Sequence, residues 1–176
     1  MFLKKQNNTV VRIYQNIVKI SRSKFFYTDL MLEDTFETRF DLVIFHAFII
    51  FHFYKEQKIE NSNVSQELFD YMFTDFENNL REMGFGDIAV NKKMKTFIKA
   101  FYGRIAQYNK GISEYFDAQD KTLLEQSILN NIFKGKKKEE VNVNDFIAYM
   151  INNIYHFAKK PESENLRNNF NFINFY

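Results

Sequence analysis

The chain has 176 residues, with 24 Lys and Arg against 22 Asp and Glu, which gives a formal net charge of +2. A charge this small does not by itself indicate a polyanionic partner. The absence of cysteine excludes disulfides, thiolate nucleophiles and zinc–sulfur sites. The sequence has 22 Phe and 10 Tyr but no Trp, and bulky aromatics can hold a helical domain together through few contacts.

The first part of the chain predicts two modest helical segments and one long helix. Residues 10–21 and 25–30 place apolar side chains at near-helical spacing. Asp34 or Thr35 is a suitable N-cap for a helix that continues to about residue 57. This long helix is apolar almost all round, which is typical of an element surrounded by others, so we expect it to form the core.

The longest apolar stretch is too short to cross a bilayer as a helix. Residues 42–54 form a run of 13 residues interrupted by His46 and His52, whereas a span needs roughly 20. Near the start, Lys4 and Lys5 are not followed by an apolar run, so the sequence shows no secretory signal. We therefore expect a cytoplasmic protein.

An acidic helix followed directly by a basic one is predicted in the middle of the chain. After a polar connection over 58–63, apolar residues recur at helical spacing from Val64 to Met83. The outer face of this segment carries Glu67, Asp70, Asp75, Glu77 and Glu82, with Arg81 as its cation. The next segment, 92–110, has an apolar stripe and a basic face made of Lys92, Lys93, Lys95, Lys99, Arg104 and Lys110. We expect Gly111 to end it.

The connection between these two helices has chemically specified ends. Gly84 can adopt the left-handed conformation that ends a helix. Phe85 is placed to fold back on the last helical turn as an apolar contact. Gly86 belongs to the same loop, and Asn91 is a suitable N-cap for the helix that follows. We predict that these four residues form a structural hinge.

The C-terminal part predicts two more helices and an aromatic tail. Asp117 or Asp120 can cap a helix that ends near Gly135, and a charged loop follows over 134–140. A last helix over 142–160 stops before Pro161. The tail, 161–176, is polar and then aromatic. We favour its docking on the core over its remaining accessible to a membrane or an apolar client.

No strand, internal repeat or domain linker stands out. The fold class is therefore all-α: a single compact helical domain of about six or seven helices. We expect a flexible N-terminus over 1–9, the helical domain over 10–160 and the tail over 161–176.

The residues make no case for catalysis, a metal or a cofactor. His46 and His52 point about 120° apart on one helix, and His52 with Glu56 offers only half a metal site. Gly84 and Gly86 begin like a phosphate loop, but Ala89 stands where a third glycine would be and the motif follows a helix. No carboxylate pair stands out as catalytic. We predict a protein that is not an enzyme.

Three segments resemble the ubiquinol–cytochrome c chaperone family. They are residues 34–48 (DTFETRFDLVIFHAF), 68–79 (LFDYMFTDFENN) and 79–104, with its blocks LREMG, GD-A-V and AFYGR. The similarity extends from about residue 14 to about residue 108. The family pattern has a proline where this chain has Asn91, which affects only how the second helix of the pair begins.

The resemblance implies a non-enzymatic assembly chaperone that binds newly made cytochrome b and promotes assembly of ubiquinol–cytochrome c reductase, respiratory complex III. It implies that the client is cytochrome b and that the protein also contacts the ribosome near the exit tunnel, a small partner protein and the surface of the inner membrane. It implies no binding to DNA. A bacterial member would act at the cytoplasmic face of that membrane and eukaryotic relatives on the matrix side. The predicted partner-binding residues are Arg81, Glu82, Lys92, Lys93, Lys95 and Arg104.

Other interpretations of the same features stay open. The basic helix over 92–110 is also suited to an RNA- or ribosome-binding factor. Its charges can instead be solvated or paired across the hinge with Glu67, Asp75 and Glu82. An enzyme with an unrecognised site and a haem-handling protein are weaker alternatives, since no histidine has a persuasive ligand context.

Overall fold

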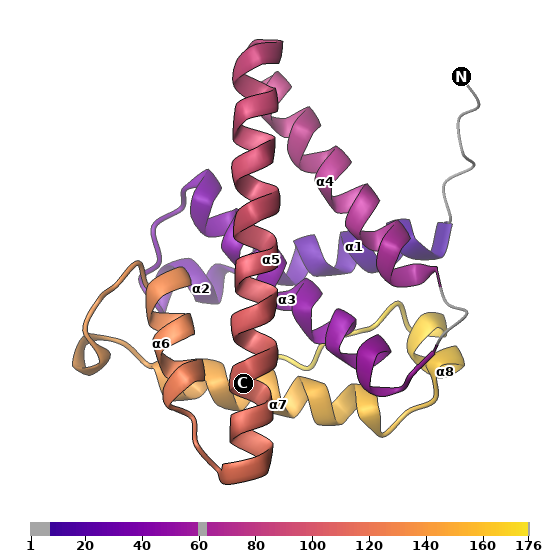
Figure 1. The fold of residues 1–176 in the computed structure, drawn as a ribbon, viewed down its shortest axis with the longest axis vertical. Coiled ribbons are helices and arrows are strands. Elements are labelled where there is room, and N and C mark those ends of the chain that lie inside the picture. The colour runs from indigo at the N-terminus through magenta and orange to yellow at the C-terminus, as the bar shows by residue number, and fades with distance from the viewer. Residues whose placement is uncertain (1–7, 60–62, 176) are drawn as a thin grey trace.

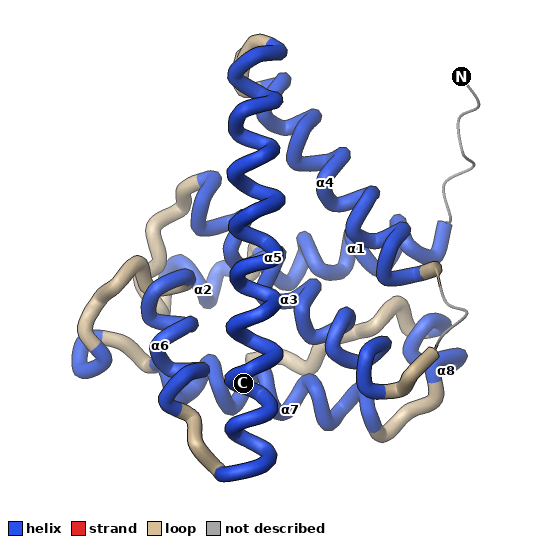
Figure 2. The backbone as a smooth tube through the Cα atoms, viewed as in Figure 1, coloured by secondary structure: helices blue, strands red, loops and turns tan. Residues whose placement is uncertain are grey.

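The structure is a computed structural model that describes residues 8–59 and 63–175. Within these ranges the chain forms six helices of ten residues or more, two short helices and one 3-10 turn, with no strand (Figures 1 and 2). The elements are α1 (Asn8–Ser21), α2 (Lys24–Thr28), α3 (Phe36–Glu56), α4 (Val64–Glu82), α5 (Asp87–Ala118), α6 (Thr122–Asn131), η1 (Lys138–Glu140), α7 (Val143–Ala158) and α8 (Glu162–Arg167). The predicted all-α domain is confirmed.

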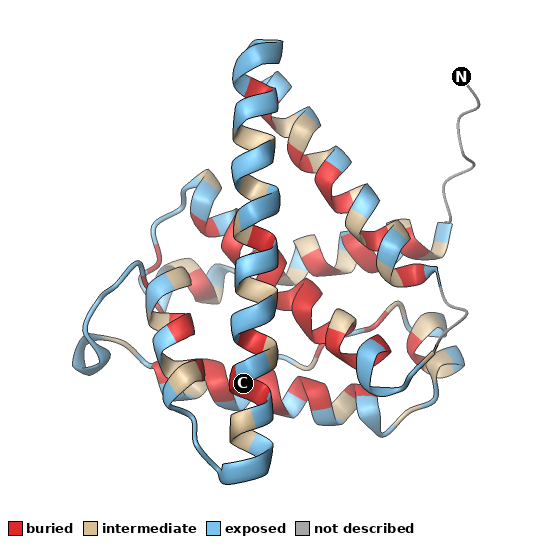
Figure 3. Ribbon diagram, in the orientation of Figure 1, coloured by how far each residue is buried: buried red, intermediate tan, exposed pale blue. Residues whose placement is uncertain are grey.

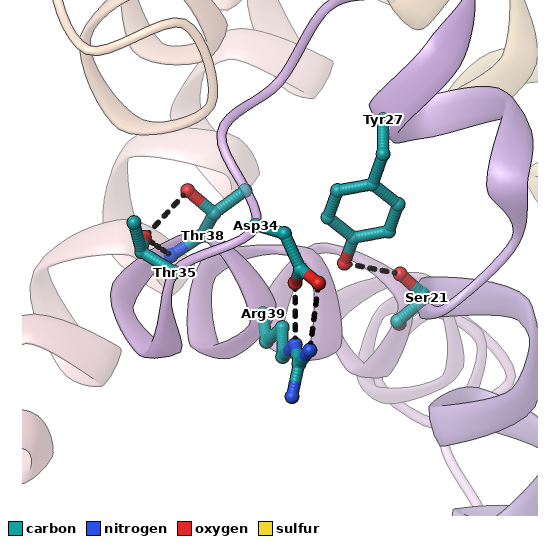
Figure 4. Close-up of polar contacts among 6 residues, drawn as sticks. All are labelled: Ser21, Tyr27, Asp34, Thr35, Thr38 and Arg39. Carbon is teal, nitrogen blue, oxygen red and sulfur yellow. Dashed lines mark hydrogen bonds and ion pairs between the residues drawn. The ribbon is translucent and has the colours of Figure 1, made fainter.

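The start of α3 is fixed by a side-chain cap and an adjacent ion pair. The Thr38 backbone N–H donates to Thr35 Oγ1 at 3.1 Å, which satisfies one of the free donors of the first turn (Figure 4). The Arg39 guanidinium donates to both carboxylate oxygens of Asp34, at 2.7 and 2.8 Å. Of the two N-caps that the sequence offered, the structure uses Thr35.

Helix α3 is the core of the molecule, as predicted. It packs against α1, α4, α5 and α7, so no side of its central turns faces water (Figure 3). The side chains with no exposed area include Leu42, Ile44, Phe45, Ala47, Phe48, Ile49 and Ile50. A helix that is apolar all round is stable only in such a position, which explains why the chain wraps its other helices around this one.

The 32-residue helix α5 is the longest element and spans about 48 Å at the usual rise per residue. It meets α4 at the turn over 83–86, and the two helices project together from the body as a hairpin (Figure 1). The other end of α5 packs on α6. Since α5 contacts α3, α4 and α6, it ties the projecting hairpin to the core.

The expectation that Gly111 ends this helix is wrong. Helix α5 continues through Gly111 to Ala118, and its end is marked by Gln119 in the left-handed conformation, with φ 56°. Gly111 is buried where α5 and α6 pack together, and a Cβ atom there would lie 2.8 Å from Leu124 Cδ2. The glycine allows two helices to approach closely, a role that a sequence pattern cannot distinguish from a helix stop.

The neighbouring helix α6 is shorter than expected. Its N-cap position is Lys121 rather than Asp117 or Asp120, although Asp120 Oδ1, one residue earlier, accepts a hydrogen bond from the Thr122 backbone N–H at 2.9 Å. Its last residue is Asn131 rather than one near Gly135. Gly135 has a positive φ of 80° and its N–H donates to the Leu129 carbonyl at 2.8 Å, so it closes the loop after the helix.

The C-terminal segment docks on the core, as we favoured. Phe170 is fully buried against Phe53, Tyr54 and Phe157, with ring centroids 5.2 to 5.8 Å apart. The Asn16 side chain of α1 donates to the Phe170 carbonyl at 2.9 Å. The tail therefore closes over α1, α3 and α7 rather than extending into solvent.

Two further expectations concern the segment limits. The predicted flexible N-terminus over 1–9 falls mostly on residues 1–7, which lie outside the described residues, while Asn8 and Thr9 are helical. Helix α7 ends at Ala158, before Pro161, as predicted. Pro161 then precedes α8, a short helix that the sequence did not indicate. The division at residue 160 between domain and tail stays a prediction.

Candidate functional site

The turn that joins α4 to α5 has the predicted geometry. Gly84 has a φ of 88° and its N–H donates to the Arg81 carbonyl at 2.9 Å. The Phe85 N–H reaches back to the Leu80 carbonyl at 3.2 Å, which satisfies a free acceptor of the last turn. This six-to-one bond around a left-handed glycine is a Schellman-type helix end, which agrees with the conformation predicted for Gly84, while an apolar contact of the Phe85 ring with the last turn stays a prediction.

The start of α5 differs from the prediction. The helix begins at Asp87, with Gly86 as the flanking residue, and Asn91 lies exposed in the second turn rather than at the cap. The Val90 N–H already donates to the Gly86 carbonyl at 3.0 Å, and Val90 is fully buried. An early start is favoured because it buries Val90 and places the Asp87 carboxylate at the positive end of the helix dipole.

Arg81 holds the turn together from the other side. Its guanidinium donates to Glu77 Oε1 at 2.8 Å, one turn earlier on α4, and also forms an ion pair with Asp87 at the start of α5. These two carboxylates raise the pKa of the Arg81 guanidinium. Arg81 therefore bridges the helices of the hairpin, whereas the neighbouring Glu82 is exposed. A partner contact for either residue stays a prediction.

The basic face of α5 is open to solvent near the hairpin turn. Within the described part of the chain, the ammonium groups of Lys92, Lys95 and Lys99 form no ion pair, and all three residues are exposed. Lys93 is half-buried, with its ammonium 4.7 Å from the centre of the Phe85 ring. The sequence also allowed these cations to form ion pairs with acidic residues of α4, Asp75 among them. Asp75 instead accepts a hydrogen bond from the Tyr14 hydroxyl at 2.7 Å.

Arg104 has a structural role that the sequence did not show. Its guanidinium lies 2.6 Å from Oδ1 of Asp41, a residue of α3 whose side chain is 2% exposed. Lys134 forms an ion pair with the other oxygen of the same carboxylate. Burial raises the pKa of Asp41, while the two cations act in the opposite direction. Arg104 thus neutralises a buried charge, and a contact with a partner stays a prediction.

A groove that the sequence analysis missed lies between the end of α3, the second half of α5 and the end of α7. Its volume is about 320 Å³, and the lining includes Ile49, His52, Phe53, Asn109, Ile112, Phe116, Ile154, Tyr155 and Ala158. Two exposed aromatics mark its rim: Phe116 and Tyr155 are 37% and 48% exposed and meet edge to face, with centroids 5.7 Å apart. The two rings continue the apolar lining of the groove, and contiguous apolar surface of this kind is typical of binding sites.

The polar groups around the groove are engaged mainly with one another. Lys55 lies 3.9 Å from Glu56 and donates to the Asn109 side chain at 3.3 Å. Ser113 donates to Asp117 at 3.0 Å. His52 forms part of the wall, and burial lowers the pKa of its imidazole, which favours the neutral ring. The groove therefore presents mostly apolar surface to an occupant.

No group of three or more His, Cys, Asp or Glu that could hold a metal ion occurs among the residues that the structure describes. The same residues include no helix that is long and apolar enough to cross a membrane.

Comparison with known proteins agrees with this architecture. Residues 28–172 match the ubiquinol–cytochrome c chaperone family. The protein CBP3, mitochondrial, of Saccharomyces cerevisiae is 28% identical over 156 residues, which cover 86% of this chain and 45% of that protein. The chain thus spans less than half the length of this curated relative.

A solved structure supports the same assignment. The crystal structure of the Cbp3 homolog from Brucella abortus superposes with a TM-score of 0.81 and 26% sequence identity, covering 97% of this chain and 91% of that one. The family match extends over most of the chain, from α2 into the C-terminal tail. This chain is therefore a member of the ubiquinol–cytochrome c chaperone family.

Proposed function

We propose that this protein is a non-enzymatic assembly chaperone that binds newly made cytochrome b and promotes assembly of ubiquinol–cytochrome c reductase, respiratory complex III. Membership of the ubiquinol–cytochrome c chaperone family indicates that the protein acts in the assembly of this complex. The observation that carries the proposal is the apolar groove with its exposed pair, Phe116 and Tyr155. A chaperone for a membrane protein needs such a surface, because its client exposes apolar segments before insertion.

The groove would act by covering a short apolar part of the client. A volume of about 320 Å³ is at the lower end of the usual range for ligand pockets, so it takes a few side chains rather than a whole helix. Phe116 and Tyr155 extend this apolar surface beyond the walls of the groove. Binding is reversible because no covalent chemistry is required, and a chaperone must release its client.

The proposal of a non-enzymatic role is supported by the state of the nearby polar groups. Catalytic sites hold polar groups that converge on a reacting atom, whereas Lys55, Asn109, Ser113 and Asp117 interact with one another along the groove. The Lys55–Asn109 bond joins α3 to α5, and Ser113 pairs with Asp117 one turn later on α5.

The proposed place of action follows from the client. Cytochrome b is a membrane subunit, so in a bacterium the protein would work at the cytoplasmic face of the inner membrane, and in mitochondria on the matrix side. A small partner protein and a ribosome near the exit tunnel are further proposed contacts, for which the exposed lysines of α5 offer a surface.

The test is co-purification of cytochrome b with tagged protein from its own cells in mild detergent. We expect Phe116→Ser and Tyr155→Ser, separately and together, to reduce the recovered cytochrome b while the protein stays folded, with only a modest decrease in melting temperature because both side chains are partly exposed. Met31→Ser is the control, because Met31 is 70% exposed and does not line the groove. Unchanged recovery with the double variant would refute the groove as the client site.

A second candidate function is supported by the row of exposed lysines on α5. As an RNA- or ribosome-binding factor, the protein would bind phosphates through the helix over 92–110. Recovery of ribosomes or RNA without cytochrome b, lost on charge reversal at Lys92, Lys93 and Lys95, would favour this function over the chaperone.

A further inference from the structure

The hairpin turn carries apolar side chains that the fold does not bury. Ile88 is 89% exposed and Met83 is 57% exposed, at the end of the hairpin that lies away from the core (Figures 1 and 3). In the described structure, Val90 is the one buried residue of the first ten in α5. Exposed apolar groups at a projecting tip gain nothing from folding, and a surface outside the chain would have to cover them.

A row of cations continues from this tip along one face of α5. Ile88, Lys92, Lys95, Lys99 and Tyr102 are separated by four, three, four and three residues, which places them on the same side of the helix. The three lysines are exposed, and Tyr102 is 59% exposed. We call Met83 together with this row the tip face.

The tip face lies on a basic stretch of the chain. Residues 83–102 hold four lysines and one aspartate, whereas the whole chain has a net charge of only +2. The aspartate is Asp87, whose carboxylate is already paired with Arg81. Within the described residues the lysine row forms no ion pair, so its charge faces solvent, and the nearest acidic group in the turn besides Asp87 is the exposed Glu82, next to Met83.

We propose that the tip face docks on an anionic lipid membrane, with Ile88 and Met83 entering the interface and Lys92, Lys95 and Lys99 facing the headgroups. This inference deepens the proposed function, on which it rests for the presence of a membrane near the client. The charge of the row is complementary to the negative surface of such a bilayer. Apolar groups that enter the interface add binding that a purely electrostatic contact lacks.

The arrangement along α5 fits a bilayer interface in depth. Lys92 and Lys95 lie about 6 and 10 Å beyond Ile88 along the helix axis, which is comparable with the depth to which interfacial helices insert. Long lysine side chains can also bend toward the headgroups while their apolar stems stay near the acyl boundary. Tilting of α5 onto the surface brings Lys99 and Tyr102 to the same level.

A nucleic acid fits the tip face less well. Single-stranded RNA is bound by aromatic side chains or arginine planes on which bases stack, together with cations. The tip offers Ile88 and Met83 instead, and Tyr102 lies about 21 Å from Ile88 along the axis. The apolar tip would have no role in phosphate binding, which separates the two cases experimentally.

The test is flotation of the full chain with vesicles of phosphatidylcholine alone or mixed with phosphatidylglycerol. We expect partition into the mixed vesicles only, weakening as salt is raised. The triple variant Lys92→Glu, Lys95→Glu and Lys99→Glu should lower the partition coefficient roughly tenfold or more. Met83→Ser with Ile88→Ser should also lower it, with little change in its salt dependence.

Matched controls exclude a general effect of charge or polarity. Lys19→Glu, Lys136→Glu and Lys137→Glu reverse three exposed lysines away from the tip face, and Met31→Ser removes another exposed apolar side chain. Both controls should bind mixed vesicles as the unchanged protein does. Equal losses in the control and tip-face triples, or no partition into mixed vesicles at low salt, would overturn the proposal.

Two further outcomes are decisive. Binding to RNA that the Lys92, Lys95 and Lys99 changes abolish and the Met83 and Ile88 changes leave intact, without vesicle binding, would overturn the proposal in favour of a nucleic-acid surface. Vesicle binding needs no client, whereas cytochrome b recovery in detergent needs no bilayer. Loss of the first with the second preserved would therefore refute only the membrane contact, and the reverse result would refute only the client assignment.

Discussion

His46 of α3 and Tyr149 of α7 form a buried hydrogen bond at the centre of the fold, in which the tyrosine hydroxyl donates to His46 Nε2 at 3.1 Å. The direction is set by the other ring nitrogen: Nδ1 lies 2.7 Å from the Leu42 carbonyl, which can only accept, so Nδ1 carries the proton. Ser21 of α1 also approaches Nδ1 at 3.0 Å. One imidazole thus connects three helices.

This ring should make the fold sensitive to acid. Burial lowers the pKa of His46 to about 4, whereas an unfolded histidine titrates near 6.5. Above pH 6.5 both states are neutral, so stability is independent of this group. As the pH falls from 6.5 toward 4 the unfolded state binds the proton first, and the free energy of unfolding should drop by about 3 kcal/mol from His46 alone.

Urea denaturation between pH 7.5 and 4.5 checks this expectation. His46→Gln keeps a donor and an acceptor but cannot titrate, so its stability should fall less steeply with acid than that of the unchanged protein. Tyr149→Phe is the control, because it removes the hydrogen bond and keeps the titrating ring. Equal pH slopes for His46→Gln and the unchanged protein would show that His46 is not the acid-sensitive group.

The buried carboxylate of Asp41 gives a second prediction. Arg104→Ala leaves Asp41 with Lys134 as its only cation, and breaking a buried ion pair costs about 3 kcal/mol or more. Lys99→Ala removes an exposed cation from the same helix and should change stability by less than about 0.5 kcal/mol. Chemical denaturation measures both. A small effect of Arg104→Ala would indicate that this residue is free to serve a partner instead.

Features fixed by local chemistry were predicted correctly from the sequence. The core helix was predicted because its apolar pattern has no polar side. Its Thr35 cap was predicted because a hydroxyl there can accept a hydrogen bond from the first turn. Gly84 follows the same logic, since its conformation depends on the few residues around it. Asn91 was misjudged because two neighbouring starts were chemically possible, and burial of Val90 selects the earlier one.

Features that depend on distant contacts were not predictable. Nothing near Arg104 in the sequence indicates that its partner is Asp41, on a helix much earlier in the chain. The groove was not predicted for a related reason. Phe116 comes after Gly111, where we expected α5 to end, so the sequence analysis did not place Phe116 on a helix face. A glycine that permits helix packing and a glycine that ends a helix look alike until the neighbour is known.

The conformation of Gly84 predicts the effect of a side chain in the turn. A Cβ atom there would meet nothing within 4 Å, so any cost comes from the positive φ of 88° alone. Gly84→Val should cost about 1–2 kcal/mol and lower the melting temperature by roughly 3–6 °C. Gly86→Ala is the control, because Gly86 has an ordinary φ of −72° and equally open surroundings. An unchanged melting temperature for Gly84→Val would contradict the helix-end role.

Gly111 and Gly103 lie in the same helix and should respond in opposite directions to a methyl group. At Gly103 nothing lies within 4 Å of an added Cβ, so Gly103→Ala should stabilise the protein by about 0.5–1 kcal/mol through helix propensity. At Gly111 the methyl would lie 2.8 Å from Leu124 Cδ2 and 3.2 Å from the Leu124 backbone nitrogen. Leu124 is fully buried, so its side chain has little room to move away.

Overpacking of this kind costs about 1–3 kcal/mol, which exceeds the propensity gain, so Gly111→Ala should be destabilising. Urea denaturation of the two variants gives the comparison directly, with the m-value as a check that unfolding stays cooperative. A further decrease for Gly111→Val would follow from the larger clash. Equal stabilisation by both alanine variants would mean that α5 and α6 do not pack as closely as the Leu124 contact requires.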